Sequence, residues 1–186
     1  GVVLTLSGGE TVKLVDNSKV FSDVTSDFWG ADAVAFASSR ELFNGTGATE
    51  FSPNAPMSRA MIVTVLARLD GVDTSAGGAW YEAGAQWAAA AGISDGSGLD
   101  QDLTREQLAA MLYRYAQYKG CDVSIGADTN ILSYTDAFAV SEYAMEAMQW
   151  ACGAGIIGGK DGLLDPSGSA TRAEVAVMLL RFVSAY

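Results

Sequence analysis

The chain has 186 residues, of which 49% are hydrophobic and 18% are charged, with a formal net charge of −11 and no histidine. This acidic balance argues against nucleic acid and against an anionic membrane surface as partners, because both require a cationic protein face. The absence of histidine removes histidine triads, histidine metal sites and the usual general base.

The first 20 residues differ from the rest of the chain. The stretch "VVLTLSGGETVKLV" alternates apolar and polar residues around Ser7-Gly8-Gly9-Glu10, which predicts a β-hairpin. We expect residues 1–20 to form a small hairpin docked on helices, or the end of a preceding β-rich domain. No signal peptide is visible, which suggests a mature or excised fragment. No apolar run approaches the roughly 18 residues needed to cross a bilayer.

From residue 21 onward the sequence repeats itself three times. When Arg59, Arg105 and Arg172 are aligned, apolar residues coincide at the third, sixth, seventh and tenth positions after each arginine. This spacing defines one apolar helix face and predicts three equivalent amphipathic helices. A second arginine recurs nine positions after the first, and we interpret it as a structural residue. These second arginines are Arg68, Arg114 and Arg181.

A first helix is predicted in each repeat by two aromatic residues seven positions apart, which would lie on one face of that helix. Sixteen positions after the first aromatic residue comes a glycine, which we expect to adopt a positive φ after the helix. The first aromatic residues are Trp29, Trp80 and Tyr143, and the glycines are Gly45, Gly96 and Gly159.

Each repeat is therefore expected to be a helix, a glycine turn, a loop and a second helix, with boundaries at 21–71, 72–120 and 121–186. The loop of the middle repeat is short, with 9 residues from Gly96 to Arg105 against 14 and 13 in the other two. A single helix pair cannot bury its apolar stripe alone. We therefore expect a mainly α structure in which the three helix pairs pack together, second helix against second helix.

The start of each second helix carries a capping signal. Thr171 and Glu174 match the capping box, the middle repeat matches it with Gln, and the first repeat keeps only the cap residue. The arginine next to the cap is not explained, because a helix N-terminus already carries partial positive charge. Two interpretations stay open for it: a carboxylate of a neighbouring repeat, such as Asp23 or Asp136, or an anionic ligand.

The order "FSDV…W…LFNG…FSPNAPMSRA", then "AW…AGISDG…LTREQ", then "YTDA…W…AGIIGG…DGLLDP…ATRAE" resembles three tandem S-layer homology domains over residues 21–186. The resemblance implies a pseudo-threefold bundle with a central core of three helices, one from each repeat. It also implies grooves between repeats that bind the terminal sugar of a secondary cell wall polymer, often a pyruvylated N-acetylmannosamine. It makes the motif arginine a ligand residue, here Arg59, Arg105 and Arg172. A guanidinium suits the pyruvate carboxylate, and helix N-terminal amides would add to the same anion site.

Further ligand-binding candidates follow from the same resemblance. Asp23 and Asp136 match the family's aspartate. Trp29 and Trp80 fit either stacking on a sugar face or core packing, and Tyr143 replaces the usual tryptophan in the third repeat. Gly45, Gly96 and Gly159 line the grooves by analogy, although a turn role alone would explain them. We expect the three grooves to be unequal.

The resemblance implies a non-catalytic anchoring module at the extracellular cell wall or S-layer. Its partners would be a cell wall polysaccharide and the N-terminal domains of the same larger protein. The alternative is a structural or protein-assembly module with degenerate sugar grooves. An enzyme is not expected, since no two acids stand out as a catalytic pair.

No cofactor or metal is expected either, because Asp161, Gly162 and Asp165 do not follow the EF-hand spacing. Cys121 and Cys152 are either a disulfide or two small buried thiols. We expect replacement of the motif arginines by alanine to leave folding nearly intact, since the caps remain.

Overall fold

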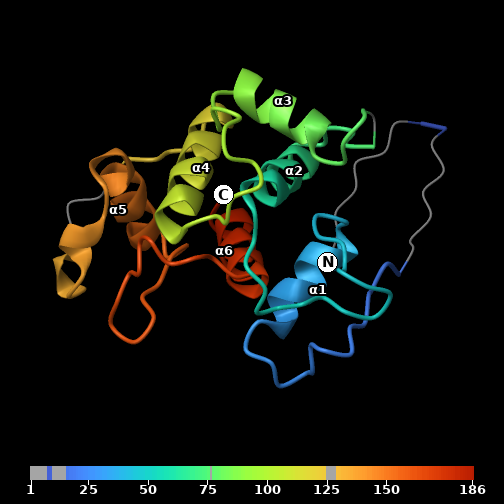
Figure 1. Cartoon of the computed structure of the whole chain (residues 1–186), viewed down its shortest axis with the longest axis horizontal. Helices are drawn as coiled ribbons and strands as arrows, with labels where there is room; N and C mark the ends of the chain where they lie inside the picture. Colours follow the sequence, from blue (N-terminus) through green and yellow to red (C-terminus); the bar gives the residue numbers. More distant parts are fainter. Residues whose placement is uncertain (1–7, 10–15, 76, 125–128) are drawn as a thin grey trace.

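The computed structural model describes residues 8–9, 16–75, 77–124 and 129–186, and these are mainly helical, as predicted (Figure 1). Most of the predicted N-terminal hairpin lies outside the described residues. Within the described ranges, no helix combines the length and the apolar character needed to span a membrane. The α-helices are α1 (Ala31–Ser39), α2 (Arg59–Leu69), α3 (Glu82–Ala90), α4 (Arg105–Tyr118), α5 (Met145–Gly153) and α6 (Arg172–Ala185). The short 3-10 helices η1 (Ile131–Ser133), η2 (Ala137–Ala139) and η3 (Glu142–Ala144) precede α5.

The second helix of each repeat begins at its motif arginine. In α6 the Thr171 hydroxyl accepts from the amide of Glu174, whose carboxylate accepts from the Thr171 amide, and α4 has the same reciprocal capping box. In α2, Ser58 accepts from the amide of Met61. The predicted caps are therefore confirmed, and the apolar faces that follow them are buried: Ile62, Leu108 and Val175, three positions after each arginine, are fully buried.

The main helix pairs join different repeats. Helix α3 packs on α2, α5 packs on α4, and α1 packs on α6, so the first helix of a repeat lies against the second helix of the repeat before it. The pair of α1 and α6 brings the first repeat against the last. Figure 1 shows α2, α4 and α6 toward the middle of the molecule, with α1, α3 and α5 around them.

A closed ring of backbone hydrogen bonds joins the segments that lead into α2, α4 and α6. The amide of Met57 donates to the carbonyl of Ala170 at 3.0 Å, Ala170 donates to Leu103 at 2.8 Å, and Leu103 donates to Met57 at 2.7 Å. Each of these residues stands two positions before a motif arginine and is fully buried. The three loops therefore meet at one point, and each motif arginine is the first residue of the helix that begins beside that point.

Candidate ligand-binding grooves

The motif arginines of α4 and α6 are buried, with exposed fractions of 3% for Arg105 and 5% for Arg172. Arg172 donates from Nε to the carbonyl of Phe51 at 2.8 Å and from Nη2 to the carbonyl of Asn44 at 2.7 Å. The equivalent bonds of Arg105 run to Leu164 at 2.8 Å and Gly158 at 3.1 Å. Each guanidinium thus joins its helix to a loop of the next repeat around the ring.

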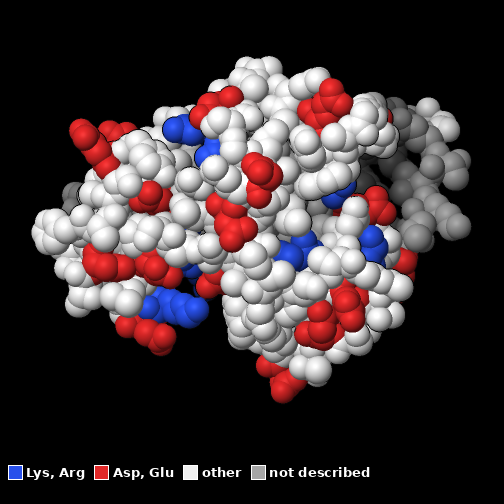
Figure 2. Space-filling view, in the orientation of Figure 1, with Lys and Arg blue, Asp and Glu red and all other residues white. Residues whose placement is uncertain are grey.

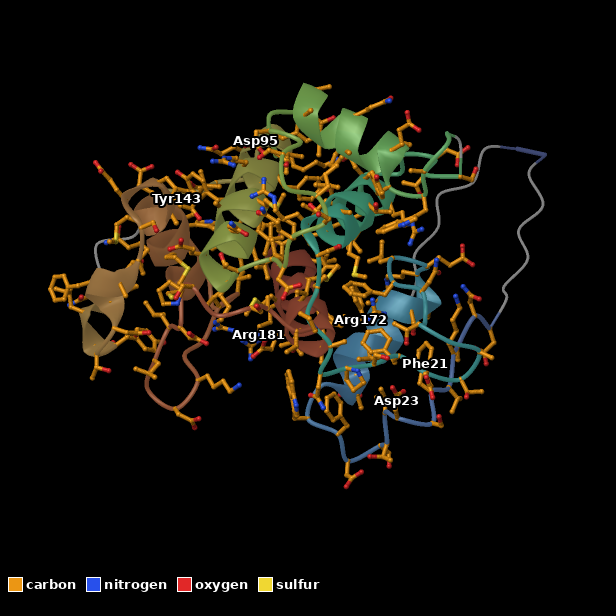
Figure 3. The ribbon with its side chains drawn as sticks, viewed as in Figure 1. Phe21, Asp23, Asp95, Tyr143, Arg172 and Arg181 are labelled. Atoms are coloured by element: carbon orange, nitrogen blue, oxygen red, sulfur yellow. The ribbon has the colours of Figure 1, made fainter. Side chains whose placement is uncertain are left out.

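A carboxylate of a neighbouring repeat is the direct partner of Arg59, through Asp95 at 2.8 Å, and Glu174 lies 3.7 Å from Arg105. The acids named from the sequence, Asp23 and Asp136, are not direct partners of Arg172 and Arg105. The nearest structural acceptors are carbonyl oxygens of a neighbouring repeat, and Asp23 acts on Arg172 at longer range. Burial lowers the pKa of Arg172, and the charge of Asp23 opposes that shift. Figure 3 shows Arg172 reaching from α6 toward the first-repeat segment that carries Phe21 and Asp23.

Asp23 and Asp136 hold the loops that the arginines contact. Asp23 accepts from the amides of Phe51 at 2.8 Å and Ser52 at 2.7 Å, and Ser52 has a φ of 57°. Asp136 accepts from Leu164 and Asp165 at 2.8 and 2.7 Å, and Asp165 has a φ of 50°. A positive φ is costly for a residue with a side chain, so both carboxylates stabilise a strained loop. Neither aspartate lines a groove described below.

Arg59 is held differently because the loop of the middle repeat is short. Its Nη2 lies 2.8 Å from the Asp95 carboxylate, in place of a carbonyl acceptor. Its Nε is buried and has no acceptor within the described part of the chain. The loop segment whose carbonyl accepts from Arg105 and Arg172 has no counterpart in the middle repeat, which explains the unpaired nitrogen.

The first aromatic residue of each repeat is exposed, with exposed fractions of 61% for Trp29, 55% for Trp80 and 54% for Tyr143. Trp29 and Trp80 lie just before α1 and α3, and Tyr143 lies in η3, so the prediction that they share a helix face with the second aromatic residue is wrong. Because more than half of each side chain is exposed, core packing is excluded for the two tryptophans. Tyr143 donates to the Glu106 carboxylate at 3.1 Å, and burial together with that charge raises its pKa to about 12.

The predicted positive φ occurs at Gly96, with φ 73°, but not at Gly45 or Gly159. A Cβ at Gly45 would lie 2.7 Å from the carbonyl oxygen of Glu50, and one at Gly159 would collide with the ring of Tyr134. Close approach, and not a left-handed turn, explains these two glycines. The left-handed residue after each first helix stands four positions before the predicted glycine. These residues are Glu41, Gly92 and Gly155.

The helix N-terminal amides that were expected to bind an anion already have protein acceptors. The amides of Arg172 and Ala173 both donate at 3.0 Å, to the carbonyls of Ala55 and Pro53 in the first repeat. The first two amides of α2 and α4 donate in the same way to loops of the middle and third repeats. The expectation that these amides add to an anion site is therefore wrong.

Three grooves lie between the repeats, and each combines residues of all three. A motif arginine comes from one repeat, a second arginine from the next, and an exposed aromatic side chain from the one after. We name each groove by its motif arginine. The Arg172 groove contains Asn44, Gly45, Met61, Arg68 and Trp80; the Arg59 groove contains Asp95, Gln107, Arg114 and Tyr143; the Arg105 groove contains Gly158, Gly159, Glu174, Arg181 and Trp29.

The groove volumes are 370, 360 and 430 Å³ in the same order, within the range of small-ligand sites. Each groove thus contains one motif arginine and one of the three aromatic residues. Gly45 and Gly159 each line a groove, whereas Gly96 does not. Figure 2 shows small areas of Lys and Arg among the many acidic side chains of the face in view, so cationic sites are local on this acidic protein.

Sequence reasoning missed the second arginines as groove residues. Each donates from Nη1 to the carbonyl that lies three positions before the predicted glycine of the same repeat: Arg68 to Leu42 at 3.2 Å, Arg114 to Ile93 at 3.3 Å, and Arg181 to Ile156 at 3.5 Å. A signal was present. The second, fifth, sixth and ninth positions after each motif arginine form another helical stripe, and in all three repeats this stripe lines a groove.

Among the described residues, no cluster of His, Cys, Asp or Glu is arranged to hold a metal ion. Cys121 and Cys152 are both free and half-buried, so the disulfide alternative is not the one that the structure adopts. Burial raises the pKa of the Cys152 thiol to about 11.

A family model of the S-layer homology domain matches residues 20–60 and 133–176. Both matched regions belong to this family. The middle repeat is not matched, in keeping with its shortened loop. An S-layer homology domain is a cell-surface anchoring domain and not a catalytic one, and the family places this chain at the cell surface.

The related proteins are far longer than this chain. It is 30% identical over 87% of its length to an amylopullulanase of Thermoanaerobacterium thermosulfurigenes, of which it covers 9%. It is 28% identical over 94% to an endoglucanase of Bacillus sp. (strain KSM-635), of which it covers 20%, and 27% identical over 92% to the exoglucanase XynX of Acetivibrio thermocellus, of which it covers 17%. A solved structure, the undecaheme cytochrome from the S-layer of Carboxydothermus ferrireducens, aligns with a TM-score of 0.47 at 20% identity, over 71% of this chain and 18% of that one.

Proposed function

We propose that the chain is a non-catalytic module that anchors a longer protein to the cell wall by binding the pyruvylated amino-sugar end of a secondary cell wall polymer. Residues 21–71, 72–120 and 121–186 are the three repeats of this module and form a pseudo-threefold bundle around α2, α4 and α6. The ring of hydrogen bonds and the three inter-repeat helix pairs support this arrangement.

The observation that carries the proposal is the recurrence of one constellation in three grooves. Each groove places a motif arginine, a second arginine and an exposed aromatic side chain around one space. Guanidinium groups bind carboxylates, and an aromatic ring offers an apolar face to a sugar. Trp29, Trp80 and Tyr143 are each more than half exposed and each lines a groove, so their rings are accessible to a sugar bound there.

Co-sedimentation with purified cell walls tests the proposal. The protein should pellet with walls that retain the secondary polymer, and should stay in solution with walls from which that polymer has been extracted. Pyruvylated N-acetylmannosamine should compete for binding, and unmodified N-acetylmannosamine should compete far less, because it lacks the carboxylate.

The matched variants are Trp80→Ala and Phe138→Ala. Phe138 is 89% exposed and lines none of the three grooves, so its replacement removes an exposed ring without touching a groove. Wall binding should weaken with Trp80→Ala and persist with Phe138→Ala. Equal binding to intact and extracted walls would overturn the proposal and favour a protein-assembly role.

A further inference from the structure

The three grooves differ in what stands beside the motif guanidinium. In the Arg59 groove, the Asp95 carboxylate lies 2.8 Å from Nη2. In the Arg105 groove, the Glu174 carboxylate lies 3.7 Å from Nη1. In the Arg172 groove, the residue that corresponds to Glu174 is Met61, and no Asp or Glu of the described ranges lines the groove.

The Nη1 group of Arg172 is thereby left with hydrogen-bonding capacity. Its Nε and Nη2 are held by the carbonyls of Phe51 and Asn44, whereas Nη1 has no acceptor within the described residues. Within the described residues, the one buried side-chain nitrogen without a partner is Arg59 Nε, so Nη1 of Arg172 is not fully buried. Arg172 also lines its groove, where Nη1 can meet a ligand. Arg68 adds a second positive charge to the same groove.

Asp95 occupies a position that carries no charge in the other two repeats. The equivalent residues are Asn44 and Gly158, whose main-chain carbonyls accept from the neighbouring motif arginine. In the middle repeat the Asp95 carboxylate takes the place of that main-chain carbonyl and accepts from Nη2 of Arg59, whereas the loop carbonyl that would accept from Nε is missing. Hydrogen bonds from Ser97 and the charge of Arg59 lower the pKa of Asp95, so the group is an anion at neutral pH.

We infer that the Arg172 groove is the primary site for an anionic sugar, and that Asp95 is a built-in anion that closes the Arg59 groove to the same ligand. The inference rests on the proposed function, since it assigns that function to one groove. The Arg105 groove should bind the anionic sugar with intermediate affinity, because its carboxylate lies farther from the guanidinium than Asp95 lies from that of Arg59.

The aromatic residues supply one reporter for each groove. Trp80 reports on the Arg172 groove and Trp29 on the Arg105 groove, while the substitution Tyr143→Trp places an indole in the Arg59 groove. The other two tryptophans, Trp87 and Trp150, line none of these grooves and serve as internal controls. Indole N–H signals are followed by NMR in the Tyr143→Trp protein during titration with pyruvylated N-acetylmannosamine.

The Trp80 signal should shift at the lowest sugar concentration, with an apparent affinity at least about tenfold tighter than that of either other groove. The indole introduced at position 143 should not move in this background. Adding Asp95→Asn, which copies the residue of the first repeat, should make it shift when the sugar is added. Asp100→Asn is the matched control, because Asp100 is an exposed aspartate that lines none of the grooves. It should change nothing.

A shift of the introduced indole or of Trp29 at a lower sugar concentration than that of Trp80 would overturn the inference. An introduced indole that stays unmoved after Asp95→Asn, in a protein that still melts cooperatively, would overturn it as well. A different result would overturn the proposed function itself, namely a wild-type protein that binds neither the sugar nor intact walls. Wall binding with no shift at Trp80 would overturn the groove assignment and leave the anchoring role standing.

Discussion

Arg172 and Phe51 join the last helix of the chain to the first repeat. The guanidinium Nε lies 2.8 Å from the main-chain oxygen of Phe51, and the guanidinium carbon lies 4.6 Å from the centroid of the same residue's ring. The buried guanidinium charge of Arg172 is therefore stabilised by carbonyl oxygens and by the face of an aromatic ring. The residue that a capping box leaves unexplained thus has a structural role before any ligand arrives.

Replacing Arg172 with alanine should lower the free energy of unfolding by about 2–4 kcal/mol, because two charge-assisted hydrogen bonds are lost and two buried carbonyls lose their donor. This differs from the expectation, drawn from the caps alone, that folding would be unaffected. Urea unfolding measures the change. Arg181→Ala, on the same helix but exposed and with one long hydrogen bond of 3.5 Å, should cost less than about 0.5 kcal/mol. Equal losses for both variants would contradict the structural role.

Asp23 and Asp136 should make stability depend on pH in the acid range. Desolvation raises the pKa of each carboxyl, but the backbone amides that donate to them outweigh it, so both pKa values lie below the ordinary one. A depressed pKa stabilises the folded state fully above the unfolded value of about 3.9, and this contribution is lost as the pH falls through the folded pKa. Thermal melting from neutral to acid pH should show a smaller acid-induced loss for Asp23→Asn/Asp136→Asn than for wild type. A parallel pH profile would rule the carboxylates out as the cause, and Asp100→Asn provides the control.

Glu41→Gly should stabilise the protein by about 0.5–1 kcal/mol. Glu41 has a φ of 58°, in the left-handed region that glycine adopts without a steric penalty, and the equivalent residues of the other repeats are Gly92 and Gly155. The gain is smaller than the full penalty because glycine also makes the unfolded chain more flexible. Chemical denaturation should show a higher midpoint for this variant and a lower one for Gly92→Ala. A destabilised Glu41→Gly protein would show that the glutamate side chain matters more than its backbone.

Tyr143 should titrate at lower pH once Glu106 is neutralised. Burial, the charge of Glu106 and its hydrogen bond raise the pKa of Tyr143 to about 12, and Glu106→Gln removes the two causes that involve a carboxylate. NMR of the tyrosine ring carbons resolves this residue from the others. An unchanged Tyr143 curve would place the Glu106 charge too far away to act.

The helices that carry the motif arginines could be predicted almost to the residue. The cap at Thr171 and the apolar spacing after Arg172 depend on residues close together in sequence, and the structure begins α6 at Arg172. The short loop of the middle repeat also pointed to unequal grooves, and the structure shows its effect in the unpaired Nε of Arg59.

The partners of these helices could not be predicted in the same way. That α1 packs on α6 depends on contacts across more than a hundred residues, and no local spacing encodes which repeat supplies the neighbour. The same is true of the carbonyl acceptors of Arg172, because every residue presents the same carbonyl whatever its side chain. The sequence predicts a left-handed turn at Gly45 and Gly159, whereas the structure shows close approach of neighbouring atoms; both requirements select glycine, so the sequence does not distinguish them.

The ring formed by Met57, Leu103 and Ala170 sets the size of the module. In a linear repeat protein each unit contacts only its neighbours, so terminal units can be trimmed or added and the ends need capping repeats. A closed ring has no terminal unit, and removal of any one repeat would break two of its three hydrogen bonds. We therefore expect a chain that lacks one repeat to lose this arrangement altogether, and not to keep two thirds of its stability.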